Sequence, residues 1–161
     1  MTGDVTIAPL NPTLRPDIEA ILRATGVFSE EEITVGLELF DTGADDDYEF
    51  IGAFLGDRLI GYACYGPTPS TDGTFDLYWI AVDPKSQGAG AGRSLMNAVE
   101  RILKERNARL VVVETSSRPE YQGTRTFYER LGYAIAARLR DFYAPNDDLV
   151  VYTKRLGLQG R

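Results

Sequence analysis

Apolar positions along this chain recur at two spacings, one typical of strands and one typical of helices. Val5–Pro9 predicts a first strand, and Leu14–Ala24 carries its apolar residues on one helical face. Ser29–Glu32 has the pattern of a capping box, so we expect a second helix to begin there and to end before Gly43. The first part of the chain therefore predicts one strand followed by two helices.

The middle of the chain predicts three strands. Tyr48–Leu55 and Arg58–Tyr65 are rich in apolar and aromatic residues, and Gly56-Asp57 between them is a hairpin signal. Phe75–Val82 follows a polar loop and predicts a longer strand. Because these strands follow one another directly, we expect them to pair antiparallel.

The remainder alternates helix and strand before it closes with two strands. We expect helices over Ala91–Arg106 and Thr124–Leu131, and strands over Arg109–Glu114, Tyr133–Leu139 and Leu149–Lys154. A strand–helix–strand segment gives one parallel step. The order predicts the α/β (α+β) class, with a mixed, mostly antiparallel sheet of about seven strands and four helices in a single domain over residues 1–161.

A glycine-rich segment joins the long middle strand to the next helix. Gly88, Gly90 and Gly92 follow one another at every second position. Glycines let the backbone approach a ligand, and free N–H groups at a helix start attract anions. The segment therefore predicts a phosphate site. It is no nucleotide P-loop, because no lysine follows Gly92, and Arg93 stands where a dinucleotide fingerprint needs its third glycine.

Composition and charge narrow the function classes. A net charge of -7 and a pI near 4.6 argue against nucleic-acid or anionic-membrane partners, and they suit a cationic substrate as well as plain solubility. The chain has no histidine, which excludes His-dependent triads and most zinc sites, so we expect no metal. Cys64, the single cysteine, lies in a predicted strand and is expected to be a small buried hydrophobe.

Targeting signals are not recognisable. Residues 1–10 carry no basic segment followed by an apolar core, and no apolar run approaches membrane-spanning length. We therefore expect a cytoplasmic location.

Two motifs carry a resemblance to a known family. Gln87–Gly92 matches Q/R-x-x-G-x-G/A directly after a strand, and Phe127–Tyr133 matches F-Y-x-x-x-G-F/Y. Together with the order of elements, they make the chain from Val5 to about Leu156 resemble the GNAT family of N-acetyltransferases. The family often carries Asn and Ala where this chain has Tyr121 and Thr124, which puts Asn-mediated contacts to the pantetheine arm in doubt.

The resemblance implies that acetyl-CoA is the cosubstrate and that a primary amine attacks its thioester directly. Backbone N–H groups of the glycine loop would hold the pyrophosphate, and the preceding strand would pair with the pantetheine arm. The donor-binding residues that it implies are Ile80, Ala81, Val82, Gln87, Gly88, Ala89, Gly90, Ala91, Gly92 and Arg93.

The resemblance also suggests how protons move. An alkylamine is mostly protonated at neutral pH, with a pKa of about 10.4, so it needs a base before attack. Tyr128 matches the family's acid, which protonates the departing thiolate. Glu114, Asp76 and a water chain stay open as the base, because Glu114 could equally be a strand-end residue facing water and Asp76 borders a polar loop.

Acceptor recognition in the family falls mainly to the first two helices and the final hairpin. Phe28, Glu32 and Tyr143 are the candidates that follow. The acceptor is expected to be a small-molecule amine or a protein amino group, and a homodimer would be in keeping with the family. The alternative from another class is a catalytically idle acyl-CoA-binding module that regulates a partner.

Overall fold

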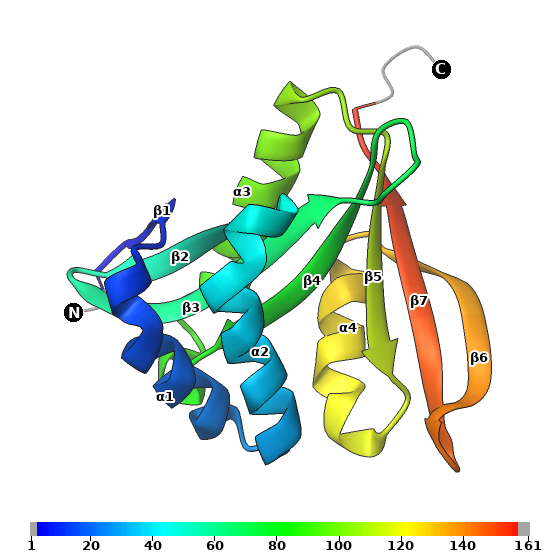
Figure 1. Cartoon of the computed structure of the whole chain (residues 1–161), viewed down its shortest axis with the longest axis horizontal. Coiled ribbons are helices and arrows are strands. Elements are labelled where there is room, and N and C mark those ends of the chain that lie inside the picture. Colours follow the sequence, from blue (N-terminus) through cyan, green and yellow to red (C-terminus); the bar gives the residue numbers. More distant parts are fainter. Residues whose placement is uncertain (1–2, 158–161) are drawn as a thin grey trace. The chain divides into compact units, whose positions relative to one another are not determined.

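The computed structural model describes residues 3–157, so Met1, Thr2 and residues 158–161 of the predicted domain lie outside it. Within this range, seven strands form a sheet in the order β1-β2-β3-β4-β5-β7-β6 (Figure 1). The strands are β1 (Val5–Pro9), β2 (Glu49–Leu55), β3 (Arg58–Pro67), β4 (Thr74–Val82), β5 (Leu110–Ser116), β6 (Ala134–Ala144) and β7 (Asp147–Arg155). The α-helices are α1 (Arg15–Thr25), α2 (Glu30–Thr42), α3 (Ala91–Glu105) and α4 (Gln122–Arg130).

Strand pairing confirms the predicted fold class. β1 pairs with β2, β2 with β3, β5 with β7 and β6 with β7, all antiparallel. β4 and β5 run parallel over Thr74–Leu77 and Leu110–Val113. This parallel step is the one that the sequence predicts, since α3 joins the two strands along the chain.

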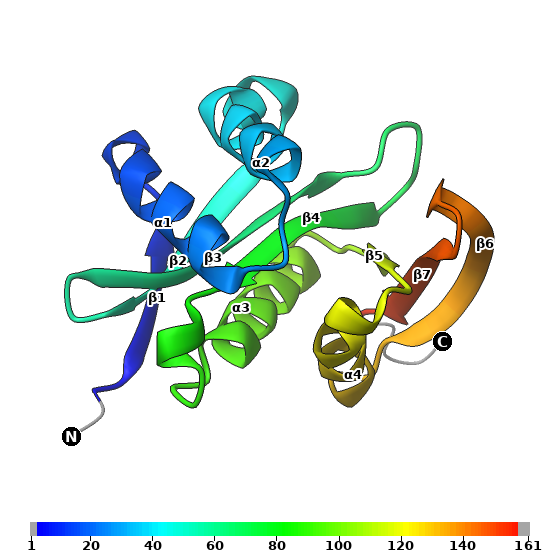
Figure 2. The same ribbon diagram turned by 90° about the horizontal axis from the view of Figure 1, so that it is seen from below.

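The described residues fall into two compact units, and the first contains the chain up to Gly66 together with Tyr78–Ile102. In this unit α1 and α2 cover one side of the strands, and α3 lies on the other (Figure 2). The predicted capping box is present, because the Ser29 hydroxyl accepts from the Glu32 N–H at 3.1 Å and the Glu32 carboxylate accepts from the Ser29 N–H at 3.0 Å. The core under α1 and α2 comprises Ile18, Ile21, Leu22, Ile33, Leu37, Leu59, Tyr62 and Ala81.

The second unit contains Pro67–Leu77 and the chain from Leu103 onward. In it α4 packs on β7, with the ring centroids of Tyr128 and Tyr152 6.0 Å apart. The Tyr152 hydroxyl donates to the Glu129 carboxylate at 2.8 Å. Burial, together with this bond, raises the pKa of Tyr152 to about 12.

Several strands, among them β5 and β6, extend beyond the residues that the sequence predicts. β5 continues past Glu114, the predicted end of the strand, to Ser116, because Thr115 and Ser116 pair with Val150 and Leu149 of β7. β6 continues to Ala144 instead of ending at Leu139, although all of its side chains are exposed. Neither extension has an apolar alternation of its own. Pairing with the distant β7 decides the end of β5, whereas β6 ends at the hairpin pair of Ala144 with Asp147.

Two further expectations concern buried and membrane-spanning residues. Cys64 is fully buried, as predicted, and burial raises the pKa of its thiol to about 12, so it remains an uncharged hydrophobe at neutral pH. None of the helices in residues 3–157 is long and apolar enough to cross a bilayer.

Candidate active site

The first unit holds the strand, turn and helix that the sequence assigns to phosphate binding. β4 ends at Val82, and the Asp83 N–H still donates to the Ile60 carbonyl at 2.8 Å. A single 3₁₀ turn, η3 (Pro84–Ser86), then leads the chain away from the sheet. The Asp83 side chain caps this turn by accepting from the Lys85 N–H at 3.0 Å.

Two glycines give the loop a shape that other residues adopt only with strain. Gly88 and Gly90 have φ angles of +95° and +80°. An added Cβ at either position would meet no heavy atom within 4 Å, so the space above the backbone is open. Glycine is therefore needed here for the backbone conformation, and it also leaves room for a ligand to lie against the chain.

Backbone N–H groups of the loop are available to such a ligand. The N–H groups of Gln87 and Ala89 donate to the carbonyls of Pro84 and Ser86, at 3.3 and 3.1 Å. In the part of the chain that the structure describes, no acceptor is found for the N–H groups of Gly88 and Gly90. The first bond of α3 is Ser94 N–H to the Gly90 carbonyl at 2.9 Å, so the N–H groups of residues 91–93 also lie ahead of the helical ladder.

These features fit a diphosphate. Free N–H groups and the positive end of the α3 dipole meet at one open, glycine-lined turn, which is the arrangement that binds phosphate oxygens. Gln87 and Arg93 are exposed beside it, whereas Ala91 is buried and Ala89 is half-buried. The loop residues predicted to bind the donor are thus brought together, with Ala91 contributing its backbone alone.

The end of β4 offers the backbone of Ile80–Val82. The ladder with β5 covers β4 only as far as Leu77, so Ile80–Val82 lie beyond it. Ala81 is buried in the core under α1 and α2, while Ile80 and Val82 are half-buried. The side chains are therefore occupied by packing, and a ligand running along this edge would be held by the backbone.

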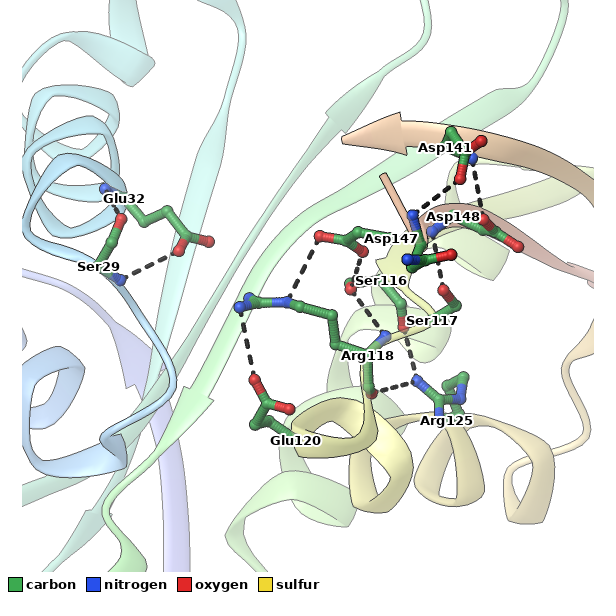
Figure 3. Close-up of polar contacts among 11 residues, drawn as sticks. Ser29, Glu32, Ser116, Ser117, Arg118, Glu120, Arg125, Asp141, Asp147 and Asp148 are labelled. Atoms are coloured by element: carbon green, nitrogen blue, oxygen red, sulfur yellow. Dashed lines mark hydrogen bonds and ion pairs between the residues drawn. The ribbon is translucent and has the colours of Figure 1, made fainter. Parts of the chain in front are cut away.

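Two predicted acceptor-binding residues also lie in the first unit. The ring centroids of Phe28 and Trp79 are 5.2 Å apart, with Phe28 packed at the edge of the core. One Glu32 oxygen accepts from the Ser29 N–H in the capping box (Figure 3). Glu32 therefore stabilises the start of α2, which leaves its second oxygen for any acceptor contact.

Sequence reasoning missed Trp79, which lies next to Ile80. The Trp79 ring fits against Gly36 of α2, where a Cβ would lie 3.2 Å from Trp79 Cζ2. The buried indole N–H and the buried Tyr62 hydroxyl have no hydrogen-bond partner in residues 3–157. A signal existed in the sequence, since Trp79 is the only tryptophan and directly precedes Ile80, one of the residues predicted to bind the donor.

In the second unit, Tyr128 is buried near the end of α4. Its ring lies 5.6 Å from Phe127 and 5.9 Å from Tyr133, centroid to centroid, and its carbonyl accepts from the Tyr133 N–H at 3.0 Å. The F-Y-x-x-x-G-Y motif thus folds onto itself, with Gly132 at a φ of +92° turning the chain. Burial raises the pKa of Tyr128, so the phenol keeps its proton at neutral pH.

The two candidate bases differ in surroundings. Glu114 is exposed in β5 between the buried Val113 and Thr115, so it lies on the opposite face of the strand from them. Asp76 is half-buried in β4 and accepts from the Thr68 hydroxyl at 2.8 Å. Glu114 is therefore open to water, whereas Asp76 is already held by a neighbour; both assignments remain predictions.

Tyr143, the third predicted acceptor-binding residue, lies in β6. It is 49% exposed and makes an edge-on contact with Phe142, at 5.0 Å between ring centroids. The exposed aromatic pair leaves Tyr143 accessible to a ligand.

A polar network ties the loop after β5 to α4 and to the β6–β7 hairpin (Figure 3). The Arg125 guanidinium donates to the carbonyls of Ser116 and Arg118, at 2.7 and 2.9 Å. The Ser116 hydroxyl donates to Asp147, and the Ser117 hydroxyl accepts from the Asp148 N–H at 2.8 Å. Because Arg125 lies in the first turn of α4, three residues before Tyr128, this network ties the start of the helix that carries Tyr128 to the loop after β5.

Asp148 makes the hairpin part of this network sensitive to acid. Its carboxylate accepts from the Asp141 N–H at 2.9 Å and from Arg138 Nε at 2.7 Å. These two bonds hold the pKa of Asp148 below its ordinary value. A depressed folded-state pKa contributes stability above the unfolded value of about 3.9, and this contribution is lost as the pH falls through the folded pKa.

We therefore expect Asp148→Asn to lower the melting temperature at neutral pH by about 3 °C. The difference from wild type should begin to shrink below about pH 3.9, where the unfolded chain takes up a proton, and it should disappear once the pH falls below the lowered pKa of the folded carboxyl. Thermal unfolding followed by circular dichroism between pH 3 and 7 measures both effects. Asp4→Asn, at an exposed residue, is the control and should follow wild type. A pH-independent difference for Asp148→Asn would contradict the assignment.

The chain is similar to known proteins over most of its length. A family model described as the acetyltransferase (GNAT) family matches residues 15–133. No curated protein gives a significant sequence match. Among solved structures, a candidate GNAT-family acetyltransferase of Desulfovibrio desulfuricans is 39% identical, with a TM-score of 0.90, over 95% of this chain and 99% of that chain.

Two more distant structures share the fold. The ribosomal-protein-S18-alanine N-acetyltransferase of Escherichia coli is 21% identical with a TM-score of 0.80, over 98% of this chain and 97% of that chain. A candidate acetyltransferase of Salmonella typhimurium, yncA, solved with acetyl-CoA, is 17% identical with a TM-score of 0.76, over 99% of this chain and 98% of that chain. The family model spans most of the chain, and the 39% identical structure covers 95% of it. The chain therefore belongs to the GNAT family of acetyltransferases.

Proposed function

We propose that this protein transfers the acetyl group of acetyl-CoA to a primary amine by direct attack on the thioester. The observation that carries the proposal is the glycine loop, where two positive-φ glycines with open space above them precede the free N–H groups of α3. The Salmonella relative was solved with acetyl-CoA, which supports the same donor here. Residues 87–93 would hold the diphosphate, and the backbone of Ile80–Val82 would hold the pantetheine arm.

Bound acetyl-CoA supplies an activated thioester; the protein supplies orientation and proton handling. The Ile80 N–H is the candidate donor to the thioester carbonyl, whose oxygen gains negative charge during attack. Tyr128 keeps its proton at neutral pH because burial raises its pKa, so it is able to donate to the departing thiolate. Deprotonation of the amine is assigned to Glu114, directly or through a water molecule.

The base assignment predicts a change in the pH profile. A carboxylate base must be ionised, so kcat/KM should fall on the acid side of the profile as the base becomes protonated. We expect Glu114→Gln to lower kcat/KM about a hundredfold and to abolish that acid limb. Asp76→Asn is the matched comparison and should retain the limb. Loss of the limb in Asp76→Asn alone, or retention in both variants, would remove Glu114 from the mechanism.

Thiol release from acetyl-CoA across a panel of amines tests the proposed function. The panel should include polyamines, aminoglycosides, amino acids and peptides with free N-termini. The net negative charge of the chain suits a cationic acceptor but does not distinguish among these amines. Acetyl-CoA binding is measured separately by calorimetry. Turnover on at least one amine supports the proposal, whereas tight binding of acetyl-CoA with no turnover on any amine would favour an acyl-CoA-binding module.

A further inference from the structure

An arginine outside the glycine loop contacts the 3₁₀ turn that precedes the loop. Arg58 begins β3, just after the hairpin, and its side chain reaches across to η3. Its Nη2 donates to the Ser86 hydroxyl at 3.2 Å, and its Nη1 lies 3.6 Å from Asp83 Oδ2. One exposed guanidinium thus contacts both ends of the turn.

The turn transmits this contact to the loop through Ser86. Ser86 is buried and is bonded at three points. Its hydroxyl accepts from Arg58, its N–H donates to the Asp83 carbonyl at 2.9 Å, and its carbonyl accepts from the Ala89 N–H at 3.1 Å. The bond between the Ser86 carbonyl and the Ala89 N–H forms a turn that contains Gln87 and Gly88. A displacement of Ser86 would therefore also displace the free N–H of Gly88.

Arg58 also pairs with the negative charge of Asp83 at the start of the turn. Asp83 divides its carboxylate, with Oδ1 accepting from the Lys85 N–H and Oδ2 facing Arg58. Residues 84–93 contain no acidic residue, so Asp83 is the acidic residue nearest in sequence to the loop that would bind a diphosphate. Pairing with Arg58 reduces that repulsion.

We propose that Arg58 is a positioning residue for the donor site, which holds η3 through Ser86 and Asp83 so that the loop N–H groups face the diphosphate. The inference rests on the proposed function, because it concerns the binding of acetyl-CoA. Arg58 acts through the turn and takes no part in the chemical step. Its loss should therefore weaken donor binding and leave kcat at saturating acetyl-CoA unchanged.

Calorimetric titration with acetyl-CoA is the primary test. We expect Arg58→Ala to raise the Kd about tenfold and Arg58→Lys about threefold, since lysine can pair with Asp83 but cannot bridge to Ser86 as well. Arg101→Ala removes an exposed cation of α3 and is the control for net charge. Equal weakening by Arg101→Ala, or a wild-type Kd in Arg58→Ala, would overturn the proposal.

Two further measurements separate positioning from direct contact. The double variant Arg58→Ala/Ser86→Ala should bind no more weakly than Arg58→Ala, because both substitutions break the same link. The tenfold loss should persist with 3′-dephospho-CoA, which keeps the diphosphate. If the loss disappears with that ligand, Arg58 contacts the 3′-phosphate and the positioning role is wrong.

The proposed function and this inference fail in different ways. If the wild-type protein binds no acetyl-CoA, the donor assignment itself is wrong. If wild type binds and Arg58→Ala binds equally well, only the role of Arg58 is wrong. Circular dichroism and thermal unfolding of Arg58→Ala verify that the variant is folded, as expected for a side chain that is 59% exposed.

Discussion

Replacing Tyr128 by phenylalanine should lower kcat about a hundredfold, the contribution typical of a positioned general acid. The substitution removes one hydroxyl and keeps the ring that packs on Phe127, Tyr133 and Tyr152. Because the ring packing is kept, the fold should lose little stability. Steady-state kinetics with the best acceptor, together with calorimetry for acetyl-CoA, separates turnover from binding.

Tyr152→Phe is the control for this substitution. Tyr152→Phe removes a neighbouring buried hydroxyl that is bonded to Glu129, so it should affect stability more than turnover. Donor affinity should stay within about twofold of wild type in Tyr128→Phe, since the proposed donor contacts come from the glycine loop. Wild-type turnover in Tyr128→Phe would show that the thiolate leaves without this acid.

The second large effect is expected at Gly90. Alanine at a φ of +80° costs about 1–3 kcal/mol, so the unliganded loop should relax away from the binding conformation. The added methyl group would also enter the open space above the loop. We expect Gly90→Ala to weaken acetyl-CoA binding about 10- to 100-fold. Calorimetry measures the affinity, and saturating acetyl-CoA should recover most of the turnover.

Gly56 provides a matched control for the strain. It has a φ of +60° in the β2–β3 hairpin, and a Cβ there would also meet nothing within 4 Å. Gly56→Ala should therefore lose stability through the same backbone cost but keep wild-type affinity for acetyl-CoA. Equal loss of affinity in both variants would mean that general destabilisation, not the shape of the loop, causes the effect.

Local patterns were sufficient for most of the architecture. The capping box at Ser29 and Glu32 involves residues three apart, so it forms as the sequence predicts. The same holds for the hairpin at Gly56, where the sequence predicts a turn between two strands. The family motifs at the glycine loop and around Tyr128 are local for the same reason.

Structural features that depend on residues distant in the sequence could not be predicted from local patterns. The end of β5 follows from pairing with β7, and Glu114 consequently lies within β5 and not at its end. Burial raises the pKa of Tyr128, and part of its surroundings, the ring of Tyr152, comes from a distant strand. The contact of Arg58 with Ser86 spans 28 positions, and an exposed arginine in a hairpin gives no sequence signal of it.

The sequence by itself determined the order of elements, the glycine loop and the family, because periodicity, capping and backbone angles depend on residues close together in the chain. Only the tertiary structure decided which N–H groups are left without acceptors, that Glu114 is exposed while Asp76 is held by Thr68, and that Arg58 fastens the loop. Those properties depend on what burial and hydrogen bonding bring together from distant parts of the chain, and this is fixed only when the chain folds.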